Sequence, residues 1–436
     1  MSEQGVIDFV TSQRWFGSKT HNVTHATVVD RALLRDREPA LELQLIEIRF
    51  DTGTHETYQL LTNGGLDAVA DASQARELVQ LIRSGAKVSA AEGIVEFEHV
   101  EGSPRLGGKL HEARPVEAEQ SNTSIVFDDE LILKVFRRLE PGINPELELL
   151  RFLTEHGFDN IAQLVGWYAY AGQPMAATLG ILQQFIAGGQ DGWELALDSL
   201  AGGPGHIPNL HRLGEVTGTM HTLLGSDPSD ANFSPEQPSA EWLGMLTATI
   251  DDEIERVFLE LPEDNDDVAP IRGRGEEVRD RLRQWAHAGT VGLVIRHHGD
   301  FHLGQTLWTG DDWVILDFEG EPARSLPERR RKRSPLRDVA GMLRSFAYAA
   351  SASSLLRGVD PPPEAEARAR SDFLEGYRST VDQFLVPAGS TMEKLLAVFE
   401  LEKAVYELRY ELNNRPDWVK IPVAGILRML EEEAPQ

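Results

Sequence analysis

Residues 296–322 read RHHGDFHLGQTLWTGDDWVILDFEGEP, and the interpretation of the whole chain starts from this stretch. Asp300 lies in a tight loop, where a carboxylate can accept a proton from an attacking hydroxyl. Gln305 follows five residues later, and its amide oxygen can coordinate Mg²⁺ from the same loop. Asp317 comes after the apolar strand 313–316, where a second Mg²⁺ ligand would face the same cavity. These three groups are what phosphoryl transfer from Mg-ATP requires.

Each of these pieces is weak alone, because an HGD tripeptide can form an ordinary turn and a DFE can open a loop. Asp300 and Gln305 stand at the spacing seen in kinases, and Asp317 follows seventeen residues after Asp300. The combination favours a catalytic role for Asp300 and Asp317 over chance.

The chain around this stretch divides into three predicted regions. Residues 1–92 combine strand-like segments at 27–34, 41–50 and 57–61 with a helix at 73–82, which predicts a small α/β cap. Residues 93–186 are mostly strand-like, with one helix that begins at Asn144. Residues 187–436 are mostly helical. A β-rich lobe joined by a short glycine-rich segment to a helical lobe is the layout of a two-lobed kinase. The segment RWFGSK (14–19) is interpreted as an aromatic staple with a glycine turn.

The composition excludes several classes of protein. The 436 residues include 42 Lys+Arg and 70 Asp+Glu, a formal net charge of −28, which disfavours binding to nucleic acid or anionic membranes. Cysteine is absent, so disulfides, thiolate metal sites and a cysteine nucleophile are excluded. No signal peptide and no membrane-spanning segment is predicted. We therefore expect a cytoplasmic protein, either a monomer or a weak dimer.

A family resemblance rests on several of these segments. HGDFHLGQ (298–305), DFEGEP (317–322) and SPLRDVAGMLRSF (334–346) resemble the maltokinase family, a branch of the aminoglycoside-phosphotransferase-like kinases. The similarity also covers RWFGSK, the Gln-Gln-Phe region at 183–185 and EKAVYELRYELNNRPDW (402–418). The resemblance implies an α+β, bilobal, protein-kinase-like fold with an extra N-terminal α/β cap subdomain and a mostly helical C-lobe.

The resemblance also implies roles for the loop residues. Asp300 would be the catalytic base, while Gln305 and Asp317 would hold Mg²⁺. Gln305 stands where related phosphotransferases more often carry Asn, and both amides offer a carbonyl oxygen.

In the first lobe, the resemblance implies that Lys134 is the lysine that contacts the phosphates of ATP. The alternative is that Lys134 is an ordinary strand residue at a sheet edge. Glu148 is the preferred glutamate to orient it and Glu146 the fallback. Either acid alternatively serves the N-terminus of its helix. The polar turn Gln120–Ser124 replaces a glycine-rich phosphate loop, with a plain hairpin turn as the equal alternative. Residues 183–186 would form the hinge that contacts adenine. The predicted nucleotide contacts are Lys134, Glu148, Ser121, Thr123, Ser124, Gln183 and Phe185.

Two charged features need an interpretation of their own. The run Arg329–Arg333 is five consecutive cations in an acidic chain. A solvated loop is the default reading, and a docking patch or a phosphate-facing loop the alternative. Asp338 is predicted to cap the helix that follows it and to brace the catalytic loop.

The acceptor pocket must place one hydroxyl within reach of Asp300. His302 lies on the same loop and either binds a neighbouring sugar hydroxyl or braces the loop. The segment 406–418 combines aromatic rings with carboxylates and amides, the groups that bind sugars. We expect Tyr410, Glu411 and Asp417 to contact the sugar.

The resemblance points first to maltose, phosphorylated on its anomeric hydroxyl to maltose 1-phosphate. The same group includes kinases of amino sugars such as glucosamine, which give the 6-phosphate. Nothing in the sequence separates the two acceptors. An aminoglycoside-type phosphotransferase is a further alternative. A non-catalytic module that docks a trehalose-converting enzyme is disfavoured, because Lys134, Asp300 and Asp317 are all present.

Overall fold

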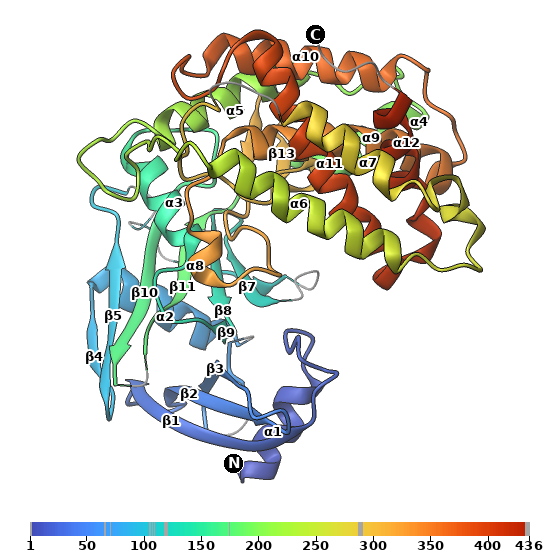
Figure 1. The fold of residues 1–436 in the computed structure, drawn as a ribbon. Helices are drawn as coiled ribbons and strands as arrows, with labels where there is room; N and C mark the ends of the chain where they lie inside the picture. The colour runs from blue at the N-terminus through green and yellow to red at the C-terminus, as the bar shows by residue number, and fades with distance from the viewer. Residues whose placement is uncertain are drawn as a thin grey trace. The chain divides into compact units, whose positions relative to one another are not determined.

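The computed structural model describes residues 2–64, 67–69, 71–103, 106, 108, 110–116, 121–173, 175–286 and 291–431. The chain forms two compact units, Met1–Gly188 and Gly189–Gln436 (Figure 1). The division falls at a glycine pair, where Gly188 has a φ of +73°. The further predicted division of the first unit at residue 92 stays a prediction.

The first unit consists of antiparallel strands and a few helices. Its elements are α1 (Glu3–Ser12), β1 (Val23–Arg35), β2 (Leu41–Phe50), β3 (His55–Thr62), α2 (Ala72–Ser84), β4 (Lys87–Ser89), β5 (Gly93–His99), β6 (Ala113–Pro115), β7 (Asn122–Phe127), β8 (Leu131–Phe136), β9 (Arg138–Leu139), α3 (Pro145–Glu155), β10 (Leu164–Gly172) and β11 (Ala176–Gln184).

These strands form two sheets. The smaller has the order β1-β2-β3-β9, and the larger has the order β4-β5-β10-β11-β8-β7-β6. The chain passes from one sheet to the other at Arg137, between β8 and β9. Trp15 and Phe16 lie in the hydrophobic core of the smaller sheet, and the side chain of Arg137 packs over the ring of Trp15. The interpretation of RWFGSK as an aromatic staple is therefore confirmed.

Most of the predicted elements of this unit are present. The strands at 27–34, 41–50 and 57–61 correspond to β1, β2 and β3, and the helix at 73–82 to α2. The helix α1 was not predicted, because its ten residues carry only two buried side chains, Val6 and Val10. The prediction of a polar turn at Gln120–Ser124 is wrong for residues 122–124, because these residues already belong to β7. Gln120 lies outside the described residues.

The second unit is mostly helical, as predicted. Its helices are α4 (Gly192–Ala201), α5 (Leu210–Leu224), α6 (Trp242–Leu259), α7 (Gly275–Trp285), α8 (Leu326–Arg329), α9 (Leu336–Ala352), α10 (Ala365–Thr380), α11 (Gly389–Asn414) and α12 (Lys420–Glu431). A small sheet has the order β12 (Gln190–Asp191), β13 (Thr306–Trp308) and β14 (Trp313–Ile315). Short 3₁₀ turns occupy Asp266–Ile271, Leu303–Gln305 and Pro416–Trp418, and a π turn occupies Ser353–Arg357.

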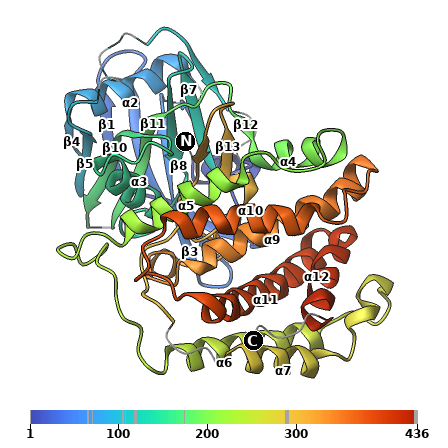
Figure 2. The same cartoon turned by 90° about the horizontal axis from the view of Figure 1, so that it is seen from above.

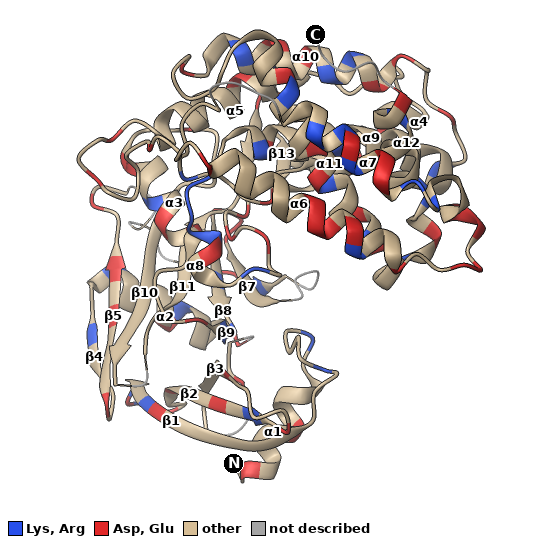
Figure 3. Cartoon of the chain, in the orientation of Figure 1, with Lys and Arg blue, Asp and Glu red and all other residues tan. Residues whose placement is uncertain are grey.

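Two helix pairs organise this unit (Figure 2). Helices α5 and α10 cross so closely that a Cβ atom on Gly214 or Gly376 would collide with the backbone of the opposite helix. Helix α11 packs against α9 on one side and shares a core with α6, α7 and α12 on another. Acidic residues gather in the second half of α6, while α7 carries acidic and basic residues, and Arg279 of α7 binds Asp251 of α6 at 2.7 Å (Figure 3). Within the described residues, no helix is both long enough and apolar enough to cross a membrane.

Candidate active site

A buried carboxylate holds the loop that carries Asp300. Asp338, in the first turn of α9, accepts the backbone N–H groups of His298 at 2.7 Å and Gly299 at 2.9 Å. Its other contact is Nε2 of His221, 3.1 Å from Oδ2. Although burial opposes ionisation, the neighbouring histidines hold the pKa of Asp338 well below its usual value. The predicted bracing role is confirmed. The capping role is wrong, because the helix begins after Pro335 and Asp338 lies inside it.

Asp300 lies between a lysine and a histidine. Nζ of Lys403 lies 3.3 Å from Oδ1 of Asp300, and Nε2 of His302 lies 4.0 Å from Oδ2. Burial acts to raise the pKa of Asp300, but the positive charge of Lys403, followed by the two nearby histidines, leaves it below its ordinary value. Asp300 is therefore ionised at neutral pH, as a proton acceptor must be.

The two predicted Mg²⁺ ligands lie next to each other. Nε2 of Gln305 lies 3.3 Å from Oδ2 of Asp317, and the backbone N–H of Leu316 donates to the carbonyl of Gln305 at 2.9 Å. Asp317 has a φ of +58°, in the left-handed region that ordinary side chains rarely adopt. Such strain is typical of functional sites. Carboxylate and amide oxygens are the ligands that Mg²⁺ takes in proteins, so this donor set fits the ion.

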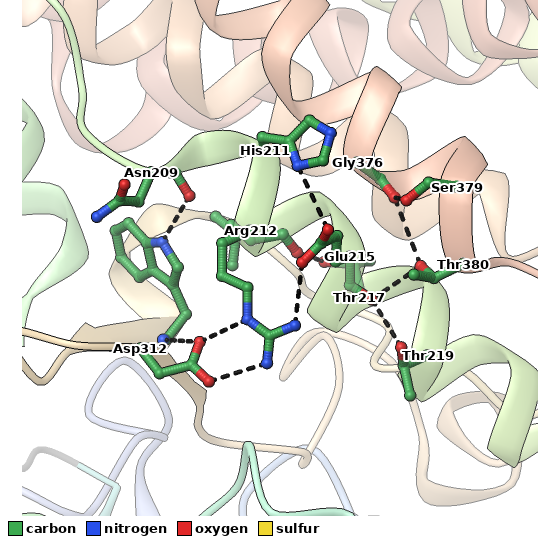
Figure 4. A network of polar contacts seen from close by, with 12 residues as sticks. Asn209, His211, Arg212, Glu215, Thr217, Thr219, Asp312, Gly376, Ser379 and Thr380 are labelled. Atoms are coloured by element: carbon green, nitrogen blue, oxygen red, sulfur yellow. Dashed lines mark hydrogen bonds and ion pairs between the residues drawn. The ribbon is translucent and has the colours of Figure 1, made fainter.

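A polar network anchors the hairpin that leads to Asp317 (Figure 4). Arg212 of α5 donates two hydrogen bonds to the carboxylate of Asp312, each 2.9 Å long. The indole N–H of the fully buried Trp313 donates to the carbonyl of Asn209 at 3.0 Å. Bidentate pairs of this kind fix geometry as well as contribute energy. The network thus fixes the strand β14, from which Asp317 projects two residues later.

A cavity of about 580 Å³ opens beside Asp300 within the second unit. Its lining combines aromatic rings and charged side chains in equal number, five of each, besides His302. The side-chain lining includes Trp193, Asp300, His302, Ser345, Tyr348, Lys403, Tyr406, Glu407, Tyr410, Glu411, Arg415 and Trp418. Five of these, from Lys403 to Glu411, stand at positions i, i+3, i+4, i+7 and i+8 of α11, which places them on one face of that helix.

Three of the four residues predicted to contact the acceptor line this cavity: His302, Tyr410 and Glu411. Asp417 does not belong to the described lining, and its side chain is exposed. It occupies the middle of a 3₁₀ turn, in which each residue points about 120° away from the next. Trp418, the next residue, faces the cavity instead, so the prediction for Asp417 is wrong.

The carboxylates of the cavity wall already have cationic partners. Arg415 binds Glu411 through two bonds of 2.9 and 2.5 Å, and its guanidinium also lies over the rings of Tyr410 and Trp418. Glu407 accepts two bonds from the buried Arg344, at 3.1 and 2.7 Å. These acids are therefore neutralised within the protein.

The sequence analysis missed Lys403, Arg415, Tyr348 and Trp193 as parts of this cavity. Lys403 had a readable signal, because it lies four residues before Glu407 and seven before Tyr410, on the same helical face. It lies three residues before the segment 406–418, from which the acceptor contacts were expected. Trp193 and Tyr348 come from α4 and α9, and only the tertiary structure brings those helices to α11.

In the first unit, Lys134 on β8 is 8% exposed, and its Nζ donates to Oε2 of Glu146 at 2.8 Å. The preference for Glu148 is therefore wrong, and the fallback is the partner. Glu146 lies in the first turn of α3 and is 1% exposed, whereas Glu148 is half-buried. Two residues correspond to about 200° of rotation around a helix, so the two acids point in different directions.

The hydroxyl residues near Lys134 differ in their orientation. Ser124 on β7 is the cross-strand partner of Lys134, so both side chains lie on the same face of the sheet. Thr123 lies on the opposite face, where its hydroxyl accepts a 2.7 Å bond from Nε of Arg137. Its predicted contact with the nucleotide therefore loses its support. Ser121 lies in an exposed bend before β7 and stays a prediction.

The predicted hinge occupies the end of β11 and the residues after it. Gln183 pairs with Ile132 of β8, and its Oε1 is buried without a hydrogen-bond partner among the described residues. The backbone N–H of Phe185 donates to the carbonyl of Glu130 at 2.8 Å, so this donor is occupied. The ring of Phe185 packs instead against the guanidinium of Arg114. Contacts between this segment and adenine stay a prediction.

The basic run Arg329–Arg333, at the end of α8, is not a solvated loop. Lys332 donates to the carbonyls of Ala231 and Ser234, at 2.7 and 2.6 Å, and Arg329 donates to the carbonyl of Glu319 at 3.1 Å. Arg331 is the exposed member of the run. The default interpretation is therefore wrong: Arg329 holds the segment that follows Asp317, and Lys332 holds the loop at 231–234.

A cavity lined by Asp300, an adjoining amide–carboxylate pair and a buried lysine–glutamate pair are features expected of a kinase-type phosphotransferase. Residues 112–357 match the phosphotransferase enzyme family, to which the chain belongs, and residues 9–82 match the maltokinase N-terminal cap domain. Both the family and the enzyme class, an ATP-dependent carbohydrate kinase, are thereby confirmed.

Characterised relatives and solved structures agree with this assignment. A glucosamine kinase of Streptacidiphilus jiangxiensis is 26% identical, over 81% of this chain and 80% of that protein. A glucosamine kinase of Mycolicibacterium smegmatis is 24% identical, over 73% of this chain and 80% of that protein. A glucosamine kinase crystal structure has a TM-score of 0.75 at 20% identity and covers 98% of this chain and 99% of that chain. Another, in complex with glucosamine, ADP and inorganic phosphate, has a TM-score of 0.72 at 20% identity, over 97% of this chain and 98% of that chain. These structural matches confirm the predicted fold.

Proposed function

We propose that this protein is a Mg-ATP-dependent kinase that phosphorylates a hydroxyl of maltose, with Asp300 as the general base. The observation that carries the proposal is the position of Asp300, which lines a cavity of about 580 Å³ rich in aromatic side chains. Aromatic rings bind the C–H faces of sugars, and volumes of this order hold compact organic ligands.

The roles of the residues follow from their positions. The acceptor hydroxyl donates its proton to the carboxylate of Asp300. The hydroxyl oxygen then attacks the γ-phosphorus of ATP, and ADP leaves. Lys134, oriented by Glu146, binds the phosphates of ATP. Gln305 and Asp317 would hold Mg²⁺, which neutralises charge on the phosphates.

The charges of the cavity favour a neutral disaccharide over an amino sugar. Glu407 and Glu411 are each bound to an arginine, and Asp300 is bound by the ammonium of Lys403. A cationic acceptor would lose its own hydration and find these carboxylates already paired. Maltose requires no counter-charge, and its second ring would be received by Tyr410 and Trp418. The maltokinase-type cap at residues 9–82 is consistent with this choice.

Glucosamine is the second candidate, because the relatives from Streptacidiphilus jiangxiensis and Mycolicibacterium smegmatis are named glucosamine kinases. An aminoglycoside acceptor has no observation of its own in its favour. The earlier expectations of a cytoplasmic location, of a monomer or weak dimer and of docking to a trehalose-converting enzyme stay predictions.

The test is ATP-dependent phosphorylation of maltose, glucosamine, glucose and an aminoglycoside by the purified protein, with and without Mg²⁺. Phosphorylation of the anomeric hydroxyl of maltose abolishes its reducing end, whereas glucosamine 6-phosphate keeps one. A reducing-sugar assay and phosphorus NMR therefore separate the two products. Turnover with glucosamine alone would contradict the choice of maltose, and turnover with none of the four would contradict the sugar-kinase proposal.

A further inference from the structure

The lysine beside Asp300 has no role in the chemistry described so far. Lys403 comes from α11, about a hundred residues after the catalytic loop, and its side chain is 29% exposed. Its Nζ lies 3.3 Å from Oδ1 of Asp300 and 5.0 Å from the centre of the Tyr406 ring. Burial acts to lower the pKa of Lys403, but Asp300 and Glu407 leave it above its ordinary value, so the ammonium is charged.

This contact is asymmetric with respect to the carboxylate. The ammonium engages Oδ1, and the opposite oxygen, Oδ2, faces His302 at 4.0 Å. Both Asp300 and Lys403 line the acceptor cavity. A carboxylate that rotates freely about its χ2 bond presents either oxygen to the acceptor, whereas one fixed at Oδ1 presents only the other.

We propose that Lys403 is a positioning residue of the phosphoryl transfer, which fixes Oδ1 of Asp300 and thereby directs Oδ2 at the acceptor hydroxyl. The inference rests on the proposed function, since it assumes that Asp300 receives the acceptor proton. Ring contact with Tyr406 and the packing of α11 hold the ammonium in place. Lys403 also compensates the negative charge of Asp300 before the acceptor binds.

The charged surroundings of Asp300 come from several elements, so the effect of Lys403 on pH dependence must be judged against all of them. They comprise His298 and His302 of its own loop, Asp317, Glu321 and Arg324 after β14, Arg337 and Asp338 of α9, and Glu402, Lys403, Tyr406 and Glu407 of α11. Among these, Lys403 is the cation with the shortest described distance to Asp300.

The experiment compares Lys403→Met, which keeps the length of the side chain but removes its charge, with Lys403→Arg, which keeps the charge. Lys394→Met, on the same helix but outside the cavity lining, is the matched control. The profile of kcat/KM against pH is measured for each with the acceptor that the wild-type protein uses. Thermal melting checks that each variant is folded.

We expect Lys403→Met to lose at least tenfold in kcat at pH 7. Its acid limb should move to higher pH by one unit or more, because a carboxylate that loses a cation within about 4 Å holds its proton more tightly. Lys403→Arg should keep the acid limb in place even where kcat falls, and Lys394→Met should match the wild type.

Two results would overturn the inference. One is a folded Lys403→Met variant with an unchanged acid limb, and the other is an equal shift in the arginine and methionine variants. The absence of wild-type turnover with every acceptor would instead contradict the proposed function. The two failures are therefore distinguishable.

Discussion

The two units each contain a lysine–carboxylate pair, buried in the first unit and part-buried in the second, and the proposed roles within the two pairs are opposite. In the first unit, Lys134 is the proposed functional group and Glu146 the residue that orients it, at 2.8 Å. In the second unit, Asp300 is the proposed functional group and Lys403 the residue that orients it, at 3.3 Å. The same pairing of charges thus prepares a cation for phosphate in one place and an anion for a hydroxyl proton in the other.

The two pairs also differ in how well the sequence predicts them. Lys134 on β8 and Glu146 on α3 are twelve residues apart, with only β9 between their elements, and the sequence predicted this lysine with Glu146 as the fallback, two residues from the preferred Glu148. Asp300 and Lys403 are 103 residues apart and meet only because α11 packs against α9 beside the catalytic loop. Local pairs follow from the order of elements, whereas distant pairs depend on the packing of helices.

The largest effect on this comparison is expected from removing the carboxylate of Asp300, the proposed base of the second unit. Asp300→Asn keeps the shape of the side chain but cannot accept the proton, so we expect kcat to fall by roughly 10³-fold. Steady-state phosphorylation of the acceptor is the measurement, with Asp311→Asn, an exposed substitution in the adjoining hairpin, as the control. Full activity in a folded Asp300→Asn protein would refute the base assignment.

The next test separates the two acids of α3. Glu146→Gln should raise the KM for ATP by roughly tenfold, because Lys134 loses the partner that orients it. Glu148→Gln is the matched control on the same helix and should change this KM by less than about twofold, since the described bond of Lys134 on this helix goes to Glu146. ATP titrations of both variants decide the point. Equal losses in the two variants would contradict the assignment of Glu146.

A smaller effect is expected at the mouth of the acceptor cavity. Tyr410→Ala removes a ring that lies against Arg415 and lines the cavity, so the KM for the acceptor should rise by about five- to tenfold with little change in kcat. The control is Phe384→Ala, which removes an aromatic ring that is 72% exposed and outside the cavity. A change in kcat alone would argue that Tyr410 acts on the chemistry and not on binding.

The smallest expected effect is on the stability of the fold. It comes from His297, which lies just before the catalytic loop. Burial lowers the pKa of His297 to about 3, whereas an unfolded histidine titrates near 6.5. The unfolded chain therefore binds the extra proton between these values, so stability is complete above about pH 6.5 and declines as the pH falls toward 3. We expect a loss of about 2 kcal/mol between pH 7 and pH 5 from this group.

Urea unfolding of the wild type and of His297→Gln at pH 7 and pH 5 measures this difference. The variant should show a weaker pH dependence, while His55→Gln, at an exposed position, should behave as the wild type. If His297→Gln showed the same pH dependence of stability as the wild type, His297 would not be the source of that dependence.

Much of the fold and part of the site could be predicted from the sequence. The spacing of Asp300, Gln305 and Asp317 predicted three groups that the structure places in one loop region, because the short hairpin β13–β14 leaves little freedom between them. Lys134 was recognisable as a lone cation in an apolar strand. Its partner could not be chosen from the sequence, because the rotation of α3 against the sheet decides which acid is buried. In the structure the buried acid is Glu146, which is 1% exposed. The partners of Arg329–Arg333 were equally hidden, since backbone carbonyls of distant loops leave no mark in the sequence.

Helix α11 presents the cavity wall on one face and contributes Val398, Leu401, Ala404, Val405 and Leu408 to a core on another. Substitution within the face from Lys403 to Glu411 can alter the acceptor without touching that core. A single inserted residue would instead turn everything beyond it by about 100° and displace both faces at once. Acceptor preference in this architecture is thus free to change by point substitution, but the length of the helix before Glu411 is constrained.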